Sequence, residues 1–94
     1  MVVATCRVDL HLLEEPQSLK GKRHILRGLK DRIRNKFEVS IAEVGDNHLW
    51  QRASLGVACV SNSKEHANSV ISKVLDFLER EREIDIIESS VEIL

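Results

Sequence analysis

Apolar residues alternate with other residues on both sides of a polar turn in the middle of the chain, over residues 38–63. The turn occupies residues 45–48 and contains glycine, aspartate and asparagine. A period near two on either side of turn-forming residues is typical of an antiparallel hairpin. The sequence therefore predicts two paired strands, with apolar positions at Val39, Ile41, Val44, Ala53, Leu55, Val57 and Cys59.

The same alternation predicts a strand from Val2 to Leu13. Every second position from Val2 to Leu12 is apolar, which is typical of a sheet with one face against a core. We expect the strand to end at the acidic pair before Pro16, because proline cannot donate to a β-ladder. The opposite face of this strand carries Val3, Thr5, Arg7, Asp9, His11 and Leu13.

The apolar period changes to that of a helix after Ser18, which is a plausible N-cap. A second helix is predicted after Ser61, Asn62 or Ser63, any of which could cap it. The last strand is expected over residues 84–93, with a polar interruption at residues 88–90. The helical apolar positions are Leu19, Ile25, Leu26, Leu29, Ile33 and Phe37 in the first helix and Ala67, Val70, Ile71, Val74, Phe77 and Leu78 in the second.

This order of elements predicts a single α+β domain spanning residues 1–94. Strand–helix–strand units joined by a hairpin indicate a ferredoxin-like split βαβ sandwich (βαββαβ). We expect a four-stranded antiparallel sheet with both helices on one face. The open face is expected to carry Ser40, Ala42, Ser54, Gly56, Ala58 and Val60 from the hairpin.

Composition is that of an ordinary globular domain, with 43% hydrophobic and 31% charged residues. No apolar run reaches the roughly 20 residues of a membrane span, and no signal peptide is visible, so we expect a cytoplasmic protein. Cys6 and Cys59 fall on core-facing strand positions and are expected to be buried free thiols. The scattered histidines show no metal-ligand spacing, and no cofactor motif is present, so neither metal nor cofactor is expected.

Charge is distributed unevenly, although the net charge is only −1. Eight of the fourteen Lys and Arg residues fall within residues 20–36, and the C-terminal segment is acidic. The resulting basic flank of the first helix suits contacts with nucleic-acid phosphates, and the alternative is a solvated face balanced by the acidic tail. The candidate RNA-binding residues are Lys20, Lys22, Arg23, Arg27, Lys30 and Arg34.

Other candidate sites lie in the hairpin turn and on the open sheet face. Trp50, Gln51 and Arg52 are candidate partner-binding residues, since a tryptophan beside an arginine can anchor recognition; alternatively Trp50 closes one end of the core. Asp9 with His11 could supply a base, but no nucleophile accompanies them. An acylphosphatase-like activity is disfavoured, because the loop at residues 13–17 is acidic and lacks glycine.

Two stretches, SLKGKRHILRGLKDRIRNKFEVSIAEV (residues 18–44) and LWQRASLGVACVSNS (residues 49–63), closely resemble the YlxP-like family of bacterial proteins of unknown function. The resemblance covers nearly the whole chain and implies the ferredoxin-like fold. The genes of this family commonly lie among translation-initiation and ribosome-maturation genes, which implies a link to the ribosome or RNA. The family has no accepted catalytic residues.

These observations together favour a small, non-enzymatic protein that contacts structured RNA or the ribosome through its basic helix. No specificity for a DNA sequence and no membrane association are expected. The alternative is a protein-interaction or homodimerisation module that uses the small residues of the open sheet face.

Overall fold

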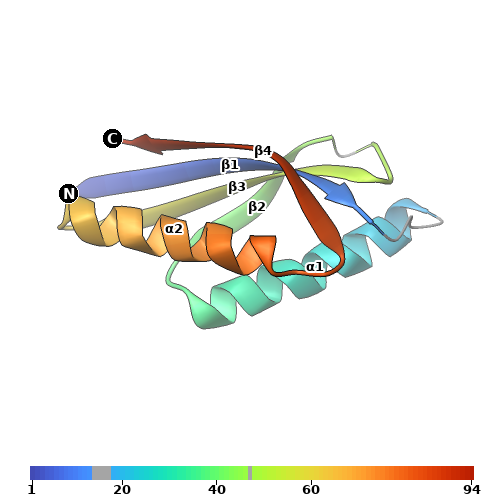
Figure 1. Cartoon of the computed structure of the whole chain (residues 1–94), viewed down its shortest axis with the longest axis horizontal. Helices are drawn as coiled ribbons and strands as arrows, with labels where there is room; N and C mark the ends of the chain where they lie inside the picture. The colour runs from blue at the N-terminus through green and yellow to red at the C-terminus, as the bar shows by residue number, and fades with distance from the viewer. Residues whose placement is uncertain (14–17, 47) are drawn as a thin grey trace.

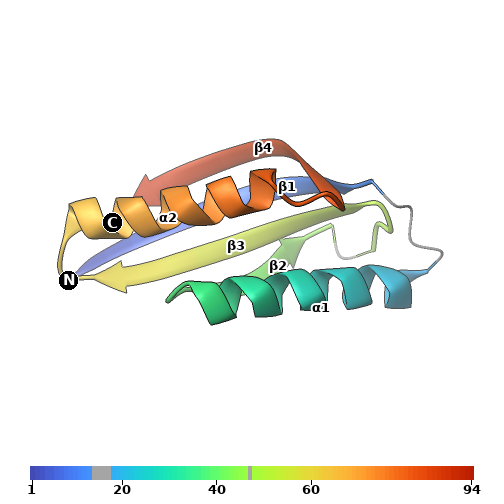
Figure 2. The ribbon, with the colours of Figure 1, turned by 60° about the horizontal axis from the view of Figure 1, so that its bottom comes forward.

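The computed structural model describes residues 1–13, 18–46 and 48–94. Both helices cover one face of a single antiparallel sheet, whose strand order is β2-β3-β1-β4 (Figures 1 and 2). The predicted ferredoxin-like βαββαβ sandwich is confirmed. The elements in chain order are β1 (Val2–Leu12), α1 (Leu19–Lys36), β2 (Ser40–Gly45), β3 (Arg52–Ser61), α2 (Lys64–Glu79) and β4 (Ile84–Ile93).

A serine begins each helix. The Ser18 hydroxyl accepts a hydrogen bond from the Gly21 backbone N–H at 3.1 Å, and the Ser63 hydroxyl accepts one from His66 at 3.2 Å. Such caps satisfy backbone donors that have no partner within the helix, and each contributes about 1 kcal/mol. Among the three candidates for the second cap, the chain therefore uses Ser63.

The core lies between the helices and the covered face of the sheet. The alternate positions of β1 from Ala4 to Leu12 are buried, as the sequence pattern predicts. Cys6 and Cys59 are free thiols and only 4% and 3% exposed, which confirms their expected burial. The helices contribute Leu26, Leu29, Ile33, Ala67, Ile71, Val74 and Leu78 to this core.

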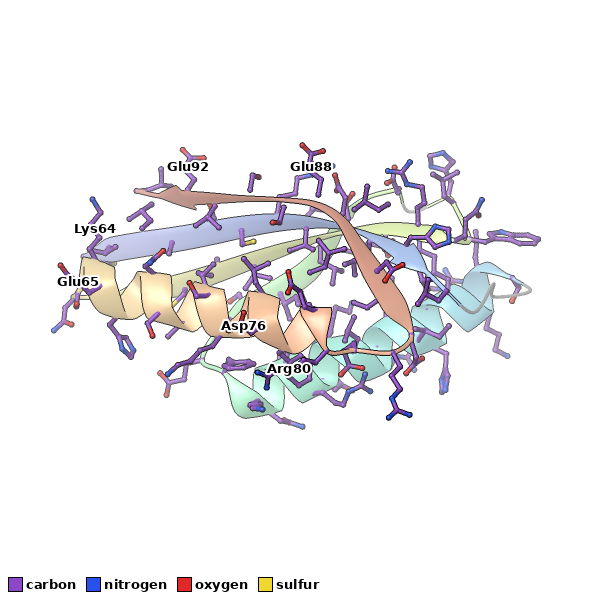
Figure 3. All side chains as sticks on the ribbon, viewed as in Figure 1. Lys64, Glu65, Asp76, Arg80, Glu88 and Glu92 are labelled. Carbon is purple, nitrogen blue, oxygen red and sulfur yellow. The ribbon has the colours of Figure 1, made fainter. Side chains whose placement is uncertain are left out.

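The last strand, β4, has the expected bounds and includes the polar residues 88–90. The strand continues through this segment because its backbone pairs with β1, with Arg7 opposite Ser90 and Asp9 opposite Glu88. A register shift at Asp9/Leu10 leaves Ile87 as an extra residue. Glu88 and Glu92 point away from the helices in Figure 3. Polar side chains in this part of β4 therefore remain in contact with solvent.

The segment at residues 14–17, on which the acidic-loop argument rests, lies outside the described residues, as does Asn47 in the hairpin turn. Within the described ranges, neither helix is both long enough and apolar enough to cross a membrane.

Candidate nucleic-acid interface

The basic flank of α1 forms one wall of a groove of about 310 Å³ beside the edge strand β2. The helical repeat brings residues three and four apart onto one side of α1, so cations spaced in this way align. Leu26 forms the apolar floor, and Glu43 is the acidic residue of the lining. The structure thus brings together four of the six predicted RNA-binding residues, Arg23, Arg27, Lys30 and Arg34.

Arg34 links α1 to β2 at one end of the groove. Its guanidinium Nη2 donates to the backbone carbonyl of Ile41 at 2.8 Å, and Nη1 lies 3.6 Å from the carboxylate of Asp31. The Ile41 carbonyl is available because β2 lies at the edge of the sheet. The Arg34 side chain remains 47% exposed, so it can hold the strand and still meet a ligand.

The other three groove cations are less constrained. In the part of the chain that the structure describes, no carboxylate forms an ion pair with Arg23, Arg27 or Lys30. Arg23 and Arg27 are exposed, and Lys30 is half-buried. Lys20 is also exposed, about one turn earlier on α1, and extends the same flank. These side chains are free to contact phosphate groups.

Lys22 is not a surface cation, and its assignment to the RNA-binding set is wrong. The side chain is only 1% exposed. Its ammonium Nζ lies 2.9 Å from Glu43 Oε2 and donates to the backbone carbonyl of Asp46 at 2.6 Å. The Lys22 ammonium is buried and already bound by these two groups. Lys22 therefore stabilises the junction of α1 with β2 and cannot reach a ligand in solvent.

This buried pair also changes the charge of the groove. Glu43 would otherwise attract the neighbouring arginines and repel a phosphate. Because the Lys22 ammonium already neutralises it, the groove presents the charges of Arg23, Arg27, Lys30 and Arg34 without an opposing free carboxylate among its lining residues.

The predicted partner-binding residues Trp50, Gln51 and Arg52 are all exposed, with Trp50 at 48%. Trp50 therefore leaves about half of its surface in solvent and does not simply close the core. Two contacts hold this segment in place. The Gln51 carbonyl accepts a hydrogen bond from the Leu12 backbone N–H at 2.8 Å, and Arg52 Nε lies 3.9 Å from Asp46 Oδ2. The contact of Lys22 with the Asp46 carbonyl places this loop beside the first turn of α1.

A polar cluster occupies the open face of the sheet. The fully buried Ser54 hydroxyl donates to Asp9 Oδ1 at 2.6 Å, and Arg7 donates to both Ser54 Oγ and Asp9 Oδ1. The Ser54 hydrogen bond lowers the pKa of Asp9 below its ordinary value, against the opposing effect of desolvation, and Arg7 lowers it further.

This cluster does not resemble a base poised for proton transfer. A general base that works near neutral pH needs a raised carboxyl pKa, whereas the pKa of Asp9 is lowered. His11 lies opposite Arg52 and Asp85 in the sheet register, and Asp9 hydrogen-bonds to Ser54 and Arg7. Across the described ranges, no three His, Cys, Asp or Glu side chains are grouped closely enough to hold a metal ion.

The sequence analysis missed one cleft. This cleft of about 700 Å³ lies between the C-terminal end of α1 and the C-terminal half of α2, and Phe37 and Phe77 form part of its wall. Both phenylalanines fit the apolar period of their helices and were therefore expected in the core, but each is only partly buried. The sequence did contain a signal for this site. Each phenylalanine lies near the end of a helix with a cation close by in the sequence, Lys36 one residue before Phe37 and Arg80 three residues after Phe77.

Comparison with known families decides the identity of the chain. Residues 3–91 match the family described as "Protein of unknown function (DUF503)". The chain belongs to the DUF503 family. This DUF503 chain is 39% identical over 74 residues to the uncharacterized protein YlxP of Bacillus subtilis (strain 168), covering 79% of this chain and 80% of YlxP. The resemblance inferred from residues 18–44 and 49–63 is confirmed.

A search of solved structures supports the fold of this DUF503 chain. A de novo designed protein with a ferredoxin fold (LFR1 1), solved by NMR in solution, superposes with a TM-score of 0.51. The match covers 100% of this chain and 84% of the designed protein at 12% sequence identity. At that identity the likeness establishes the architecture alone.

Proposed function

We propose that this DUF503 protein is a non-enzymatic accessory protein that contacts structured RNA, with the ribosome as its expected setting. The observation that carries the proposal is the groove between α1 and β2. Arg23, Arg27 and Lys30 line it and have no ion-pair partner in the described structure, and Arg34 closes one end. Cations aligned along one groove suit successive phosphates of a nucleic-acid backbone.

Two further features support this proposal. The buried Lys22 neutralises Glu43, so the groove does not repel phosphate through its one carboxylate. The exposed Trp50 lies in the loop between β2 and β3, and the exposed Arg52 begins β3. The hydrogen bond of Lys22 to the Asp46 carbonyl holds this loop next to the start of α1. An RNA strand in the groove would have this loop close to its path, where an indole can stack on an unpaired base or pack against a protein partner.

The proposal is tested by lowering the net charge by two in the groove and, as a control, by two elsewhere. The test variant is Arg23→Gln with Arg27→Gln, and the matched control is Lys64→Glu, which changes the net charge by the same amount at an exposed position that lines neither the groove nor the cleft between α1 and α2. Binding to a ribosomal RNA hairpin and to isolated ribosomal subunits is measured by fluorescence anisotropy and co-sedimentation. Loss of two phosphate contacts should weaken binding on the order of 10- to 100-fold near 0.1 M salt, and the control should change it only slightly. Equal effects of both variants would exclude the groove.

A second candidate function is self-association through the open sheet face. Val44 and Val60 are 52% and 65% exposed, and Val44 borders a shallow depression of about 380 Å³ whose floor includes Ala42, Gly56 and Ala58. A second copy could bury these side chains face to face. Light scattering over a hundredfold range of concentration tests this candidate: a mass that stays at the monomer value removes it, and a dimer that Val44→Asp dissociates supports it.

A further inference from the structure

The cleft between α1 and α2 exposes an aromatic pair. The rings of Phe37 and Phe77 meet edge to face, with centroids 6.0 Å apart and an interplanar angle of 83°. They are two of the three aromatic residues of the chain. Both are partly buried against the core and also line the cleft, so part of their ring surface is available to a ligand.

Cations surround this aromatic pair. The Lys36 ammonium lies 5.3 Å from the Phe77 ring centroid and 5.8 Å from that of Phe37. Lys73 lines the cleft from α2, and Arg80, the residue that follows α2, lines it beside the C-terminal end of that helix (Figure 3). The cleft therefore combines a ring surface with several positive charges.

One of the acidic residues of the cleft is already neutralised. Glu81 Oε2 accepts from Arg32 at 3.1 Å, in an ion pair that links the loop after α2 to α1. The remaining acidic residues of the lining are outnumbered by its cations, which are Lys36, Lys73, Arg80 and Arg82 against Asp76 and Glu83. The net charge of the lining is thus positive, and an anion is favoured over a cation.

We propose that this cleft binds a nucleotide, with its base against Phe77 and Phe37 and its phosphate on Lys36 and Lys73. A planar base and an anionic group are the two features that the cleft recognises, and its volume lies in the range of small-molecule sites. Lys36 can leave the ring faces to meet a phosphate because it is exposed at the end of α1. The same chemistry is offered by a free nucleotide and by an unpaired nucleotide of an RNA.

This site is separate from the basic groove. At about 100° per residue, Lys36 lies about 160° around α1 from Arg34, so the cleft and the groove occupy different flanks of the helix. Arg23→Gln with Arg27→Gln should therefore leave nucleotide binding in the cleft unchanged. Failure of one site does not entail failure of the other.

The test is a titration of ¹⁵N-labelled protein with AMP, UMP, ribose 5-phosphate and adenosine, followed by amide chemical shifts. We expect the nucleotides to shift amides of residues 36–37 and 73–83, with weaker effects from ligands that lack the base or the phosphate. Phe77→Leu, which keeps an apolar side chain, and Lys36→Gln should each weaken AMP binding roughly tenfold. Lys64→Gln, at the other end of α2, should leave it unchanged.

Equal shifts from ribose 5-phosphate and AMP, or shifts outside the cleft, would overturn the proposal. The two sources are then separated with RNA hairpins that have the same length and differ by one unpaired nucleotide. Stronger binding of the hairpin with the unpaired nucleotide, lost in Phe77→Leu, assigns the cleft to RNA. Equal binding of both hairpins, together with AMP binding, assigns it to a free nucleotide.

Discussion

Lys22 and Glu43 form an ion pair inside the protein, with Nζ and Oε2 2.9 Å apart and the lysine side chain 1% exposed. The pair joins the first turns of α1 to the edge strand β2. The lysine also donates to the Asp46 carbonyl, which lies at the end of the hairpin next to the Trp50 loop. One buried side chain therefore connects the helix that carries the basic groove, the strand that forms its other wall, and the exposed loop beside it.

Removal of one partner of this pair should destabilise the fold. Glu43→Gln leaves a buried ammonium without its counter-charge, and losses of about 3 kcal/mol are typical when a buried pair is broken in this way. Urea unfolding followed by circular dichroism measures the change. Glu43→Gln should lower the midpoint of unfolding clearly more than Glu38→Gln, a control at an exposed position just before β2.

A double variant separates the pair from simple packing. Lys22→Met with Glu43→Gln removes both charges, so it should recover part of the stability that Glu43→Gln loses, because no unpaired ammonium remains. If the two substitutions were additive, the ion pair would not be the reason for the loss. The double variant, measured under conditions where it is folded, should also leave the RNA affinity close to that of the natural sequence, because it removes the buried ammonium together with the groove carboxylate that the ammonium neutralises.

The Ser54–Asp9 hydrogen bond predicts how the pKa of the Asp9 carboxyl group responds to substitution of Ser54. The native-state pKa of Asp9 lies below its ordinary value chiefly because the buried Ser54 hydroxyl donates to its carboxylate. Ser54→Ala should raise this pKa toward the ordinary value near 3.9. The measurement is an NMR pH titration of the Asp9 carboxyl carbon; an unchanged pKa in Ser54→Ala would contradict the assignment.

The same lowered pKa implies a pH-dependent contribution to stability. A carboxyl group whose pKa is lower in the folded state than in the unfolded chain stabilises the fold fully above its unfolded pKa, about 3.9. That contribution is lost as the pH falls through the folded-state pKa. Asp9→Asn should therefore show a shallower loss of stability than the natural sequence below about pH 4, with little change of slope between pH 5 and 7.

Two glycines should respond to alanine in opposite directions. A Cβ at Gly28, in the middle of α1, would meet only Arg32 Nη1 at 3.4 Å, so Gly28→Ala should stabilise the protein by up to about 1 kcal/mol. A Cβ at Gly56, in β3, would lie 2.9 Å from Val44 Cγ1. Gly56→Ala should therefore destabilise the fold, and Val44→Ala should partly relieve the clash. Thermal unfolding of Gly28→Ala, of Gly56→Ala and of the double variant Gly56→Ala with Val44→Ala measures both effects.

The cysteines should report on unfolding. Burial raises the pKa of the Cys6 thiol, which disfavours the reactive thiolate, and both thiols are nearly inaccessible. Alkylation by iodoacetamide should therefore be slow in the native protein and accelerate in denaturant in parallel with the loss of circular dichroism. Rapid alkylation of native Cys6 would show that the core around β1 opens without global unfolding.

Much of the fold follows from periodicity. The alternation of β1 and the three- and four-residue spacing of both helices place the apolar residues correctly, because burial of one face is the main constraint on a sheet or helix. The bounds expected for β4, residues 84–93, are confirmed, because backbone pairing with β1 maintains a strand even where its side chains are polar.

The site was harder to predict, because charge alone does not reveal exposure. Lys22 stands four residues before Leu26 and thus on the core-facing side of α1, so its spacing indicated burial while its charge suggested the surface. Its partner Glu43 comes from a distant part of the sequence, and only the fold brings the two together. The aromatic cleft was missed for the related reason that Phe37 and Phe77 fit a core pattern while leaving part of each ring at the surface.

The salt dependence of RNA binding tests the proposed function most directly. Affinity for a ribosomal RNA hairpin is measured from about 50 to 200 mM salt for the natural sequence and for Arg23→Gln with Arg27→Gln. Four or five phosphate contacts predict a slope of log affinity against log salt near −4, and loss of two contacts should make it shallower by about 2. A slope near zero, or one that the double variant leaves unchanged, would contradict the assignment of RNA binding to the groove between α1 and β2.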